Sequence, residues 1–288
     1  MTPPAHWRRP LALLALLWTA IAGLFARDIA HMVGIWWVSS TYNHILLIPP
    51  LIIWLVAERS GLIAPLRPDP WRPGIALLAC AAMVWLSGQA SDIALLRHLG
   101  VVLMLQSAVA AALGPLLVRA LSFPMAYALF LVPFGDEIVP LFQHLTAQLM
   151  MPLLTLAGIP ASLDGLYITT PSGIFVVAEA CSGVMFLIAM AAFAILAAHL
   201  CFKSWQRRII FVVSALLTTI IANALRAFGT IAIAEQYGHQ YARGVDHLVY
   251  GWVFFAVTII AVMLVARRWF DRPANDPAID LTRLTANG

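Results

Sequence analysis

The sequence predicts an all-α polytopic membrane protein with about eight transmembrane helices, and three observations lead to that fold class. Hydrophobic residues make up 62% of the chain and charged residues 10%, and the mean hydropathy is +0.90. Soluble domains do not have such a composition. The apolar residues form runs close to the roughly 20 residues that cross a bilayer. Short basic clusters separate these runs, as orientation signals do in membrane proteins.

The expected spans follow one another with most of the charge in their connecting loops. They cover residues 11–26, 45–57, 74–87, 99–118, 121–132, 183–200, 209–228 and 247–266. The first run could be a signal peptide, but no small-x-small cleavage site follows it, so we expect an uncleaved span. The spans form one integral membrane domain over residues 1–268, followed by a cytoplasmic polar tail over residues 269–288.

Residues 133–180 form the longest segment between expected spans. Its first part, residues 136–156, is moderately apolar and predicts an interfacial helix or a re-entrant piece. Its second part, residues 159–177, places prolines and glycines between β-branched residues, which predicts a small extended or hairpin element.

Basic residues orient the chain. With both termini in the cytoplasm, thirteen of the 17 lysines and arginines lie inside and four lie outside, namely Arg27, Arg97, Arg226 and Arg243. This positive-inside bias predicts that the segment over residues 133–180 faces the periplasm. The net charge of +4 is spread over short clusters between apolar runs, so we expect no nucleic-acid partner. Membrane lipids surround the spans.

Three polar clusters lie at the ends of long apolar runs, in residues 177–183, 222–226 and 245–247. In this topology Cys181 begins the sixth span, Arg226 lies near the end of the seventh, and His247 opens the eighth, all on the outer face. Consecutive spans with short connections usually pack side by side. We therefore expect the three residues to meet as nucleophile, arginine and histidine.

Each of the three residues also has a structural interpretation. A cysteine at a membrane helix can be a packing residue, but a helix N-terminus favours the thiolate form that attacks carbonyl carbon. An arginine can snorkel to the interface, yet a charge beside an apolar run usually faces the protein interior and has a role. Asn223 lies one turn before Arg226, so both can serve an anionic group or a developing oxyanion.

A histidine at the interface often only hydrogen-bonds locally, whereas beside a cysteine it is the natural general acid and base. His44 faces the same side and is the reserve candidate. Glu179 could orient the histidine, pair with Arg226, or be a solvated loop acid. Ser182 and Asp246 are supporting candidates because they adjoin Cys181 and His247. Cys80 and Cys201 lie in apolar runs and are expected to be packing residues.

These clusters resemble the signature blocks of the exosortases, most closely the A-type exosortases of Gram-negative bacteria that make exopolysaccharide. The similar blocks are residues 179–183 (Glu-Ala-Cys-Ser-Gly), 222–226 (Ala-Asn-Ala-Leu-Arg) and 244–247 (Gly-Val-Asp-His) with 250–252 (Tyr-Gly-Trp). Residues 40–44 with 49–50, and residues 132–135, resemble the N-terminal and middle blocks. The resemblance therefore covers most of the chain.

The resemblance implies a multispan cysteine protease or transpeptidase of the inner membrane, a hydrolase acting on peptide bonds. Its partners would be exported proteins with a C-terminal Pro-Glu-Pro motif, one transmembrane helix and a basic tail, sorted in connection with exopolysaccharide. Cys181 matches the family's nucleophile, Arg226 its arginine and His247 its histidine. Some relatives carry an extra C-terminal domain that this sequence lacks, so we expect cleavage and transfer alone.

Two other functions remain open at the level of the sequence. One is a glycan or lipid transporter in which Arg226 contacts an anion, although no paired halves with broken helices are visible. The other is a non-enzymatic assembly factor for exopolysaccharide export. The sequence has no metal-ligand spacing, P-loop or dinucleotide fingerprint, so we expect neither a metal nor another cofactor.

Overall fold

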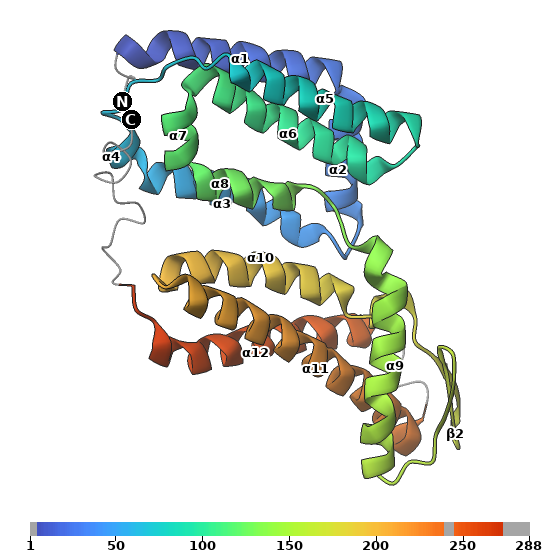
Figure 1. Ribbon diagram of the computed structural model, residues 1–288. Helices are drawn as coiled ribbons and strands as arrows, with labels where there is room; N and C mark the ends of the chain where they lie inside the picture. The colour runs from blue at the N-terminus through green and yellow to red at the C-terminus, as the bar shows by residue number, and fades with distance from the viewer. Residues whose placement is uncertain (1–4, 239–244, 273–288) are drawn as a thin grey trace. The chain divides into compact units, whose positions relative to one another are not determined.

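The computed structural model describes residues 5–238 and 245–272, and for residues 245–250 it gives the backbone alone. The chain divides into two compact units, the first ending at Phe134 and the second beginning at Gly135 (Figure 1). Helices dominate both units, which confirms the prediction of an all-α polytopic membrane protein.

The first unit is built from helices alone. Its elements are α1 (Ala5–Leu24), α2 (Ala26–Val38), η1 (Asn43–Leu47), α3 (Ile48–Glu58), α4 (Ser60–Ile63), α5 (Pro73–Ala90), α6 (Ala94–Leu113), α7 (Pro115–Ala120), α8 (Ser122–Tyr127) and η2 (Ala128–Leu131). Helices α5 and α6 form a close antiparallel pair, and α1 packs against α6 (Figure 1). A Cβ atom at Gly100 would lie 2.6 Å from Trp85 Cβ, so the small residue permits this close approach.

The second unit combines long helices with one small sheet. Its elements are η3 (Asp136–Ile138), α9 (Val139–Leu156), β1 (Ser162–Asp164), β2 (Tyr167–Thr170), β3 (Gly173–Val176), η4 (Glu179–Cys181), α10 (Val184–Cys201), α11 (Trp205–Tyr237), α12 (Val245–Ala266) and η6 (Arg267–Trp269). The helix and the extended element expected between residues 136 and 177 are therefore both present.

The sheet is antiparallel with the order β1-β2-β3, and Ile168 of the central strand pairs with Leu163 on one side and Phe175 on the other. These three side chains pack into an apolar cluster with Leu154 of α9 and Ile231 of α11. The alternation of side chains along each strand thus gives the sheet one buried face, which fixes it to the two helices.

Among the described residues, five helices are long and apolar enough to cross a membrane, or up to seven if each of two bent helix pairs crosses as one. In one of these pairs, α1 and α2 meet at an angle of 82°. Residues 43–58 form a further, shorter apolar helix. The expected number of eight spans thus stays a prediction.

Most expected span limits differ by a few residues from the observed helices, and two expected spans end well away from the last residue of the helix. The span expected over residues 99–118 ends at Leu113 because Gly114 adopts a φ of +86° and Pro115 begins a new helix. A Cβ atom at Gly114 would lie only 2.2 Å from the carbonyl oxygen of Asp69. The span expected over residues 209–228 continues to Tyr237 as part of α11: Gly229 does not interrupt the helix, and Ile231 and Ala234 are buried on its continuation.

The segment after α12 is bonded to the connection between α10 and α11. The backbone N–H of Lys203 donates a 2.7 Å hydrogen bond to the carboxylate of Asp271, and Arg207 lies 3.4 Å from it. The bond from Lys203 and the charge of Arg207 lower the pKa of Asp271. Residues 269–272 of the expected polar tail thus contact the second unit, and residues 273–288 lie outside the described part of the chain.

Candidate functional site

The cysteine turn, residues 178–183, connects strand β3 to helix α10. Cys181 is the last residue of the 3₁₀ turn η4, its backbone N–H donates to the carbonyl oxygen of Ala178 at 2.8 Å, and it is partly exposed. Before the turn, Gln143 of α9 donates a 2.7 Å hydrogen bond to the carbonyl oxygen of Val177. Both bonds hold the backbone at the point where the chain leaves the sheet.

Helix α10 begins at Val184, three residues after Cys181, which agrees with the predicted start of the sixth span. Gly183 precedes it with a left-handed φ of +81°, a conformation that side chains with a Cβ rarely adopt. A Cβ atom there would also lie 2.5 Å from Cγ of Asn223. Ser182 is buried, and its hydroxyl oxygen accepts a 3.3 Å bond from the N–H of Val184.

Asn223 of α11 joins the cysteine turn to α9. Its buried amide nitrogen donates to the carbonyl oxygen of Cys181 at 3.0 Å and to the hydroxyl oxygen of Thr146 at 3.2 Å. Thr146 in turn donates to the carbonyl oxygen of Ser182 at 3.2 Å. Two helices and the turn thus share one buried network of hydrogen bonds, in which the Oδ1 atom of Asn223 is left without a partner among the residues that the structure describes.

Arg226 lies one turn further along α11 and is 4% exposed. Its Nη2 donates a 3.4 Å hydrogen bond to the carbonyl oxygen of Ala180, and the centre of its guanidinium group lies 5.4 Å above the ring of Phe186. The cation therefore contacts the turn and an aromatic ring inside the second unit. These contacts differ from those of an arginine that snorkels to the interface.

The length of α11 indicates the depth of these two side chains. Asn223 and Arg226 lie 18 and 21 residues after the first residue of the helix, Trp205. At a rise of 1.5 Å per residue, they lie about 27 and 32 Å along it. The hydrocarbon core of a bilayer is about 30 Å thick. A crossing that begins at Trp205 would therefore end close to both side chains.

Helix α12 approaches the same guanidinium group. A Cβ atom at Gly251 would lie 3.2 Å from Nη1 of Arg226 and 3.3 Å from the ring of Phe186, so the helix backbone itself covers the arginine. The helix begins at Val245. The predicted residues His247 and Asp246 belong to its first turn, and their side chains lie outside the described part of the structure.

Two other predicted residues have different surroundings. The side chain of Glu179 is exposed at the start of the turn. The reserve candidate His44 belongs to η1 of the first unit, where its Nδ1 lies 3.1 Å from the carbonyl oxygen of Thr41. Asn223, Arg226 and the turn that carries Cys181 and Ser182 are the predicted residues that the structure brings together.

Sequence reasoning missed Gln143 and Thr146, which hold the cysteine turn from α9. The polar residues of this helix that stand out first in the sequence are His144 and Gln148, and both are exposed. Gln143 and Thr146 are three residues apart and share a face with the buried Ala147 and Met150. That spacing of polar residues on the apolar face is the signal that could have identified them.

Glu235, near the end of α11, is a further residue that the sequence did not single out. Its carboxylate accepts hydrogen bonds from the Thr170 hydroxyl, from the Ser172 hydroxyl at 2.6 Å and from the Ser172 backbone N–H at 3.2 Å. These residues form the turn between β2 and β3. The carboxylate therefore fastens the sheet to the helix that also carries Asn223 and Arg226.

Chemically, this arrangement places a partly exposed thiol on a turn whose backbone accepts hydrogen bonds from two helices, one of them through a buried cation. Within residues 5–238 and 251–272, no group of three or more histidine, cysteine, aspartate or glutamate side chains is arranged to hold a metal ion.

A comparison with models of protein families gives a match over most of the chain. The family model described as transmembrane exosortase matches residues 36–264, which include the cysteine turn, Asn223, Arg226 and the start of α12. The searches of curated proteins and of solved structures found no match.

Proposed function

Because this chain belongs to the transmembrane exosortase family, we propose that it cleaves C-terminal sorting signals of exported proteins by acyl transfer to a cysteine. Family membership supports a membrane transpeptidase role in general. The finer proposal is a cysteine peptidase or transpeptidase whose substrates carry a Pro-Glu-Pro motif, a transmembrane helix and a basic tail. Its role would be protein sorting linked to exopolysaccharide.

The observation that carries the proposal is the contact between Arg226 and the turn that bears Cys181. A buried guanidinium group is costly unless it has partners, and here it donates to the residue next to the cysteine. A fixed cation bonded to the turn that carries a partly exposed thiol suits a reaction in which a carbonyl oxygen becomes negative. A packing cysteine would not require such a neighbour.

In the proposed reaction, His247 takes the proton of the Cys181 thiol, and the sulfur attacks the carbonyl carbon near the Pro-Glu-Pro motif. Arg226 stabilises the tetrahedral oxyanion, an interaction worth about 3–4 kcal/mol in comparable sites. As the C–N bond breaks, His247 returns the proton to the leaving amine. An acceptor nucleophile or water then attacks the thioester and releases the cysteine.

The register of α12 supports the part given to His247. Residues four apart lie on the same side of an α-helix, so His247 belongs to the side of α12 that carries Gly251. Gly251 is the residue whose backbone lies against Arg226. Asp246, next to the histidine, would be a supporting residue.

Asn223 takes a positioning role in this proposal. Its amide nitrogen has two hydrogen atoms, and the bonds to Cys181 and Thr146 use both. It therefore holds the turn, while Arg226 is the oxyanion donor. Ser182 supports the turn in the same way. Glu179, exposed at the mouth of the site, would orient His247 or contact the substrate.

The proposed orientation places both termini in the cytoplasm and the cysteine turn on the periplasmic face of the inner membrane. The basic residues support it, because thirteen of 17 then lie inside. A single cysteine at position 164 should react with an impermeant thiol reagent in intact cells. One at position 205 should react only after permeabilisation, and labelling of position 205 in intact cells would reverse the orientation.

The decisive test uses the nucleophile itself. Cys181→Ala should abolish cleavage of a co-expressed sorting-signal protein, which would accumulate at full length, while the altered enzyme reaches the membrane at its normal level. Cys181→Ser should also fail, because the histidine is poorly matched to deprotonate an alcohol. Cys80→Ala and Cys201→Ala are the matched controls and should process normally, since Cys201 lies at the far end of α10 and Cys80 in α5.

Trapping the acyl intermediate separates this function from the two alternatives. A hydroxylamine-sensitive adduct between Cys181 and the substrate would identify the enzyme, whereas a transporter or an assembly factor forms none. Cleavage that persists in both Cys181→Ala and Cys181→Ser would show that the cysteine turn is structural.

A further inference from the structure

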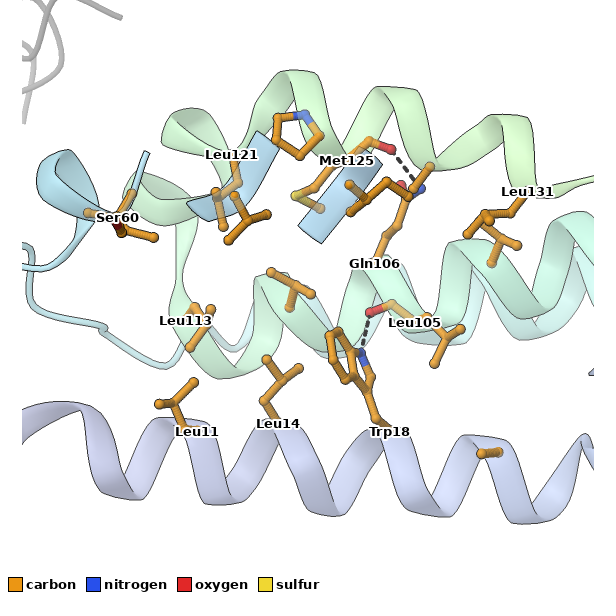
Figure 2. Close-up of a pocket in the computed structure, with 18 of the residues that line it drawn as sticks. Leu11, Leu14, Trp18, Ser60, Leu105, Gln106, Leu113, Leu121, Met125 and Leu131 are labelled. Atoms are coloured by element: carbon orange, nitrogen blue, oxygen red, sulfur yellow. Dashed lines mark hydrogen bonds between the residues drawn. The ribbon is translucent and has the colours of Figure 1, made fainter. Parts of the chain in front are cut away.

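The first unit contains an apolar cavity that is separate from the cysteine chemistry. It has a volume of about 760 Å³ and lies between α1 and α6 on one side and α3 and α8 on the other (Figure 2). Its walls along α1 extend from Trp7 to Ala22. At a rise of 1.5 Å per residue, that is a length of about 22 Å.

Hydrogen-bond donors on the cavity wall are bonded to backbone carbonyl oxygens of other lining residues. The indole N–H of Trp7 donates to the carbonyl oxygen of Ala64 at 3.1 Å, and that of Trp18 donates to Leu105 at 3.0 Å. The side-chain amide of Gln106 donates to the carbonyl oxygen of Met125 at 2.9 Å (Figure 2). Because these donors already have backbone partners, the wall presents a hydrocarbon surface, and its ligand must be apolar.

A membrane supplies two kinds of apolar ligand, a transmembrane helix and a lipid acyl chain. The dimensions of the cavity show which of the two it can hold. A helix about 10 Å across and 30 Å long fills on the order of 2,000 Å³, far more than this cavity holds. A volume of 760 Å³ lies within the range of about 300–1,000 Å³ for pockets that bind small molecules. The length of about 22 Å exceeds the roughly 15 Å depth of one leaflet's hydrocarbon. A lipid acyl chain therefore fits at full extension.

One end of the cavity carries a concentration of positive charge. Trp7, Ser60 and Leu121 line this end. The chain segments around them, residues 5–9, 57–72 and 114–121, contain six arginines and only two carboxylates. Of these arginines, Arg8 and Arg9 are exposed next to Trp7. Anionic phospholipid headgroups are attracted to such basic segments at the membrane surface.

We propose that this cavity is a binding site for an acyl chain of an anionic phospholipid, whose headgroup lies against the arginines at the end marked by Trp7. The tail occupies the space between α1, α3, α6 and α8 and completes the packing of the unit. The lipid is thus a structural ligand of the first unit, and the proposal does not depend on the function of Cys181.

The test uses the whole protein in phosphatidylcholine nanodiscs that contain a small fraction of phosphatidylglycerol with a photoactivatable diazirine on its acyl chain. After illumination and proteolysis, adducts should lie on the lining residues of α1, α3, α6 and α8. Diazirine-labelled phosphatidylcholine of the same chain length should give an adduct yield lower by about fivefold or more, since the arginines favour the anionic headgroup.

Two pairs of matched variants make the test specific. Ala22→Phe and Ala128→Phe fill the cavity and should lower the adduct yield about tenfold, whereas Ala20→Phe and Ala126→Phe, which do not line it, should leave the yield unchanged. Arg8→Gln combined with Arg9→Gln should remove the preference for phosphatidylglycerol. Equal yields from the two lipids, equal yields from filled and unfilled variants, or adducts confined to other helices would each overturn the proposal.

Discussion

The cysteine region of the second unit and the cavity region of the first use polar side chains in opposite ways. Around the turn, Gln143, Thr146 and Asn223 are buried and point toward a connecting backbone that lacks regular secondary structure. Around the cavity, Trp18 and Gln106 donate to carbonyl groups of helices and leave an apolar wall.

The difference shows what each region is built to stabilise. A buried polar group must find a partner, so a network of such groups fixes whatever carries those partners. In the second unit the partners are the carbonyl groups of Val177, Cys181 and Ser182, and the network therefore positions one reactive loop. In the first unit the bonds only remove polarity from a surface, which leaves it suitable for hydrocarbon.

The largest expected difference between the units is in the response of one arginine from each, Arg226, which is buried, and Arg97, which is partly buried. Arg226→Lys should lower processing about a hundredfold to a thousandfold, nearly as much as Arg226→Ala, because an ammonium group lacks the planar guanidinium fork. Arg97→Lys, in the first unit, keeps the ion pair with Asp28 and should change processing by less than twofold. Initial rates of substrate cleavage measure both effects.

Near-normal processing by Arg226→Lys would remove the proposed oxyanion role and make the two arginines equivalent. The membrane level of each variant, measured by immunoblot, is the control for misfolding.

A smaller effect is expected when Gly183, the last residue before α10, is replaced by alanine. Gly183→Ala introduces about 1–2 kcal/mol of left-handed strain, and its Cβ would also overlap Asn223, with a cost of about 1–3 kcal/mol for an overpacked site. Gly158→Ala is the matched control, since its φ is also positive, at +71°, but its Cβ would meet nothing within 4 Å.

Thermal midpoints in detergent should therefore fall further for Gly183→Ala than for Gly158→Ala, and only the former should lose processing. Equal midpoints would mean that Asn223 yields to the added methyl group and that the network is looser than its distances indicate.

The smallest effect is expected when the same substitution, glutamine to leucine, is made in each of the two regions. Gln143→Leu and Gln106→Leu each remove one side-chain bond to a backbone carbonyl, with a similar cost of about 1 kcal/mol in stability. Only Gln143→Leu frees the segment before Cys181, so it alone should lower the cleavage rate, by about tenfold. If both variants lowered the rate equally, the distinction between a positioning network and an apolar wall would be wrong.

The sequence predicted those features that depend on local patterns. The uninterrupted apolar run after Gly183 predicted α10 closely, and the i, i+3 spacing of Asn223 and Arg226 predicted a shared direction. Charge in an apolar run singled out Arg226 because burial of an arginine requires compensation.

Features that depend on distant contacts were not predictable in this way. Thr146 is separated by 77 residues from Asn223, and no property of either residue alone specifies their bond. The end of α6 at Gly114 depends on the close approach of Asp69, a contact between segments far apart in the sequence. The cavity likewise exists only once four helices are assembled.

The attachment of the sheet through Glu235 has a mechanical consequence for the second unit. Asn223 and Glu235 are twelve residues apart on one uninterrupted helix, a distance of about 18 Å along its axis. Because a helix is stiff over three turns, α11 acts as a rod with the cysteine turn fixed at one point and the tip of the hairpin at another. A force applied to the hairpin would be transmitted to the turn as a displacement of the whole rod, so the two would move, or stay at rest, together.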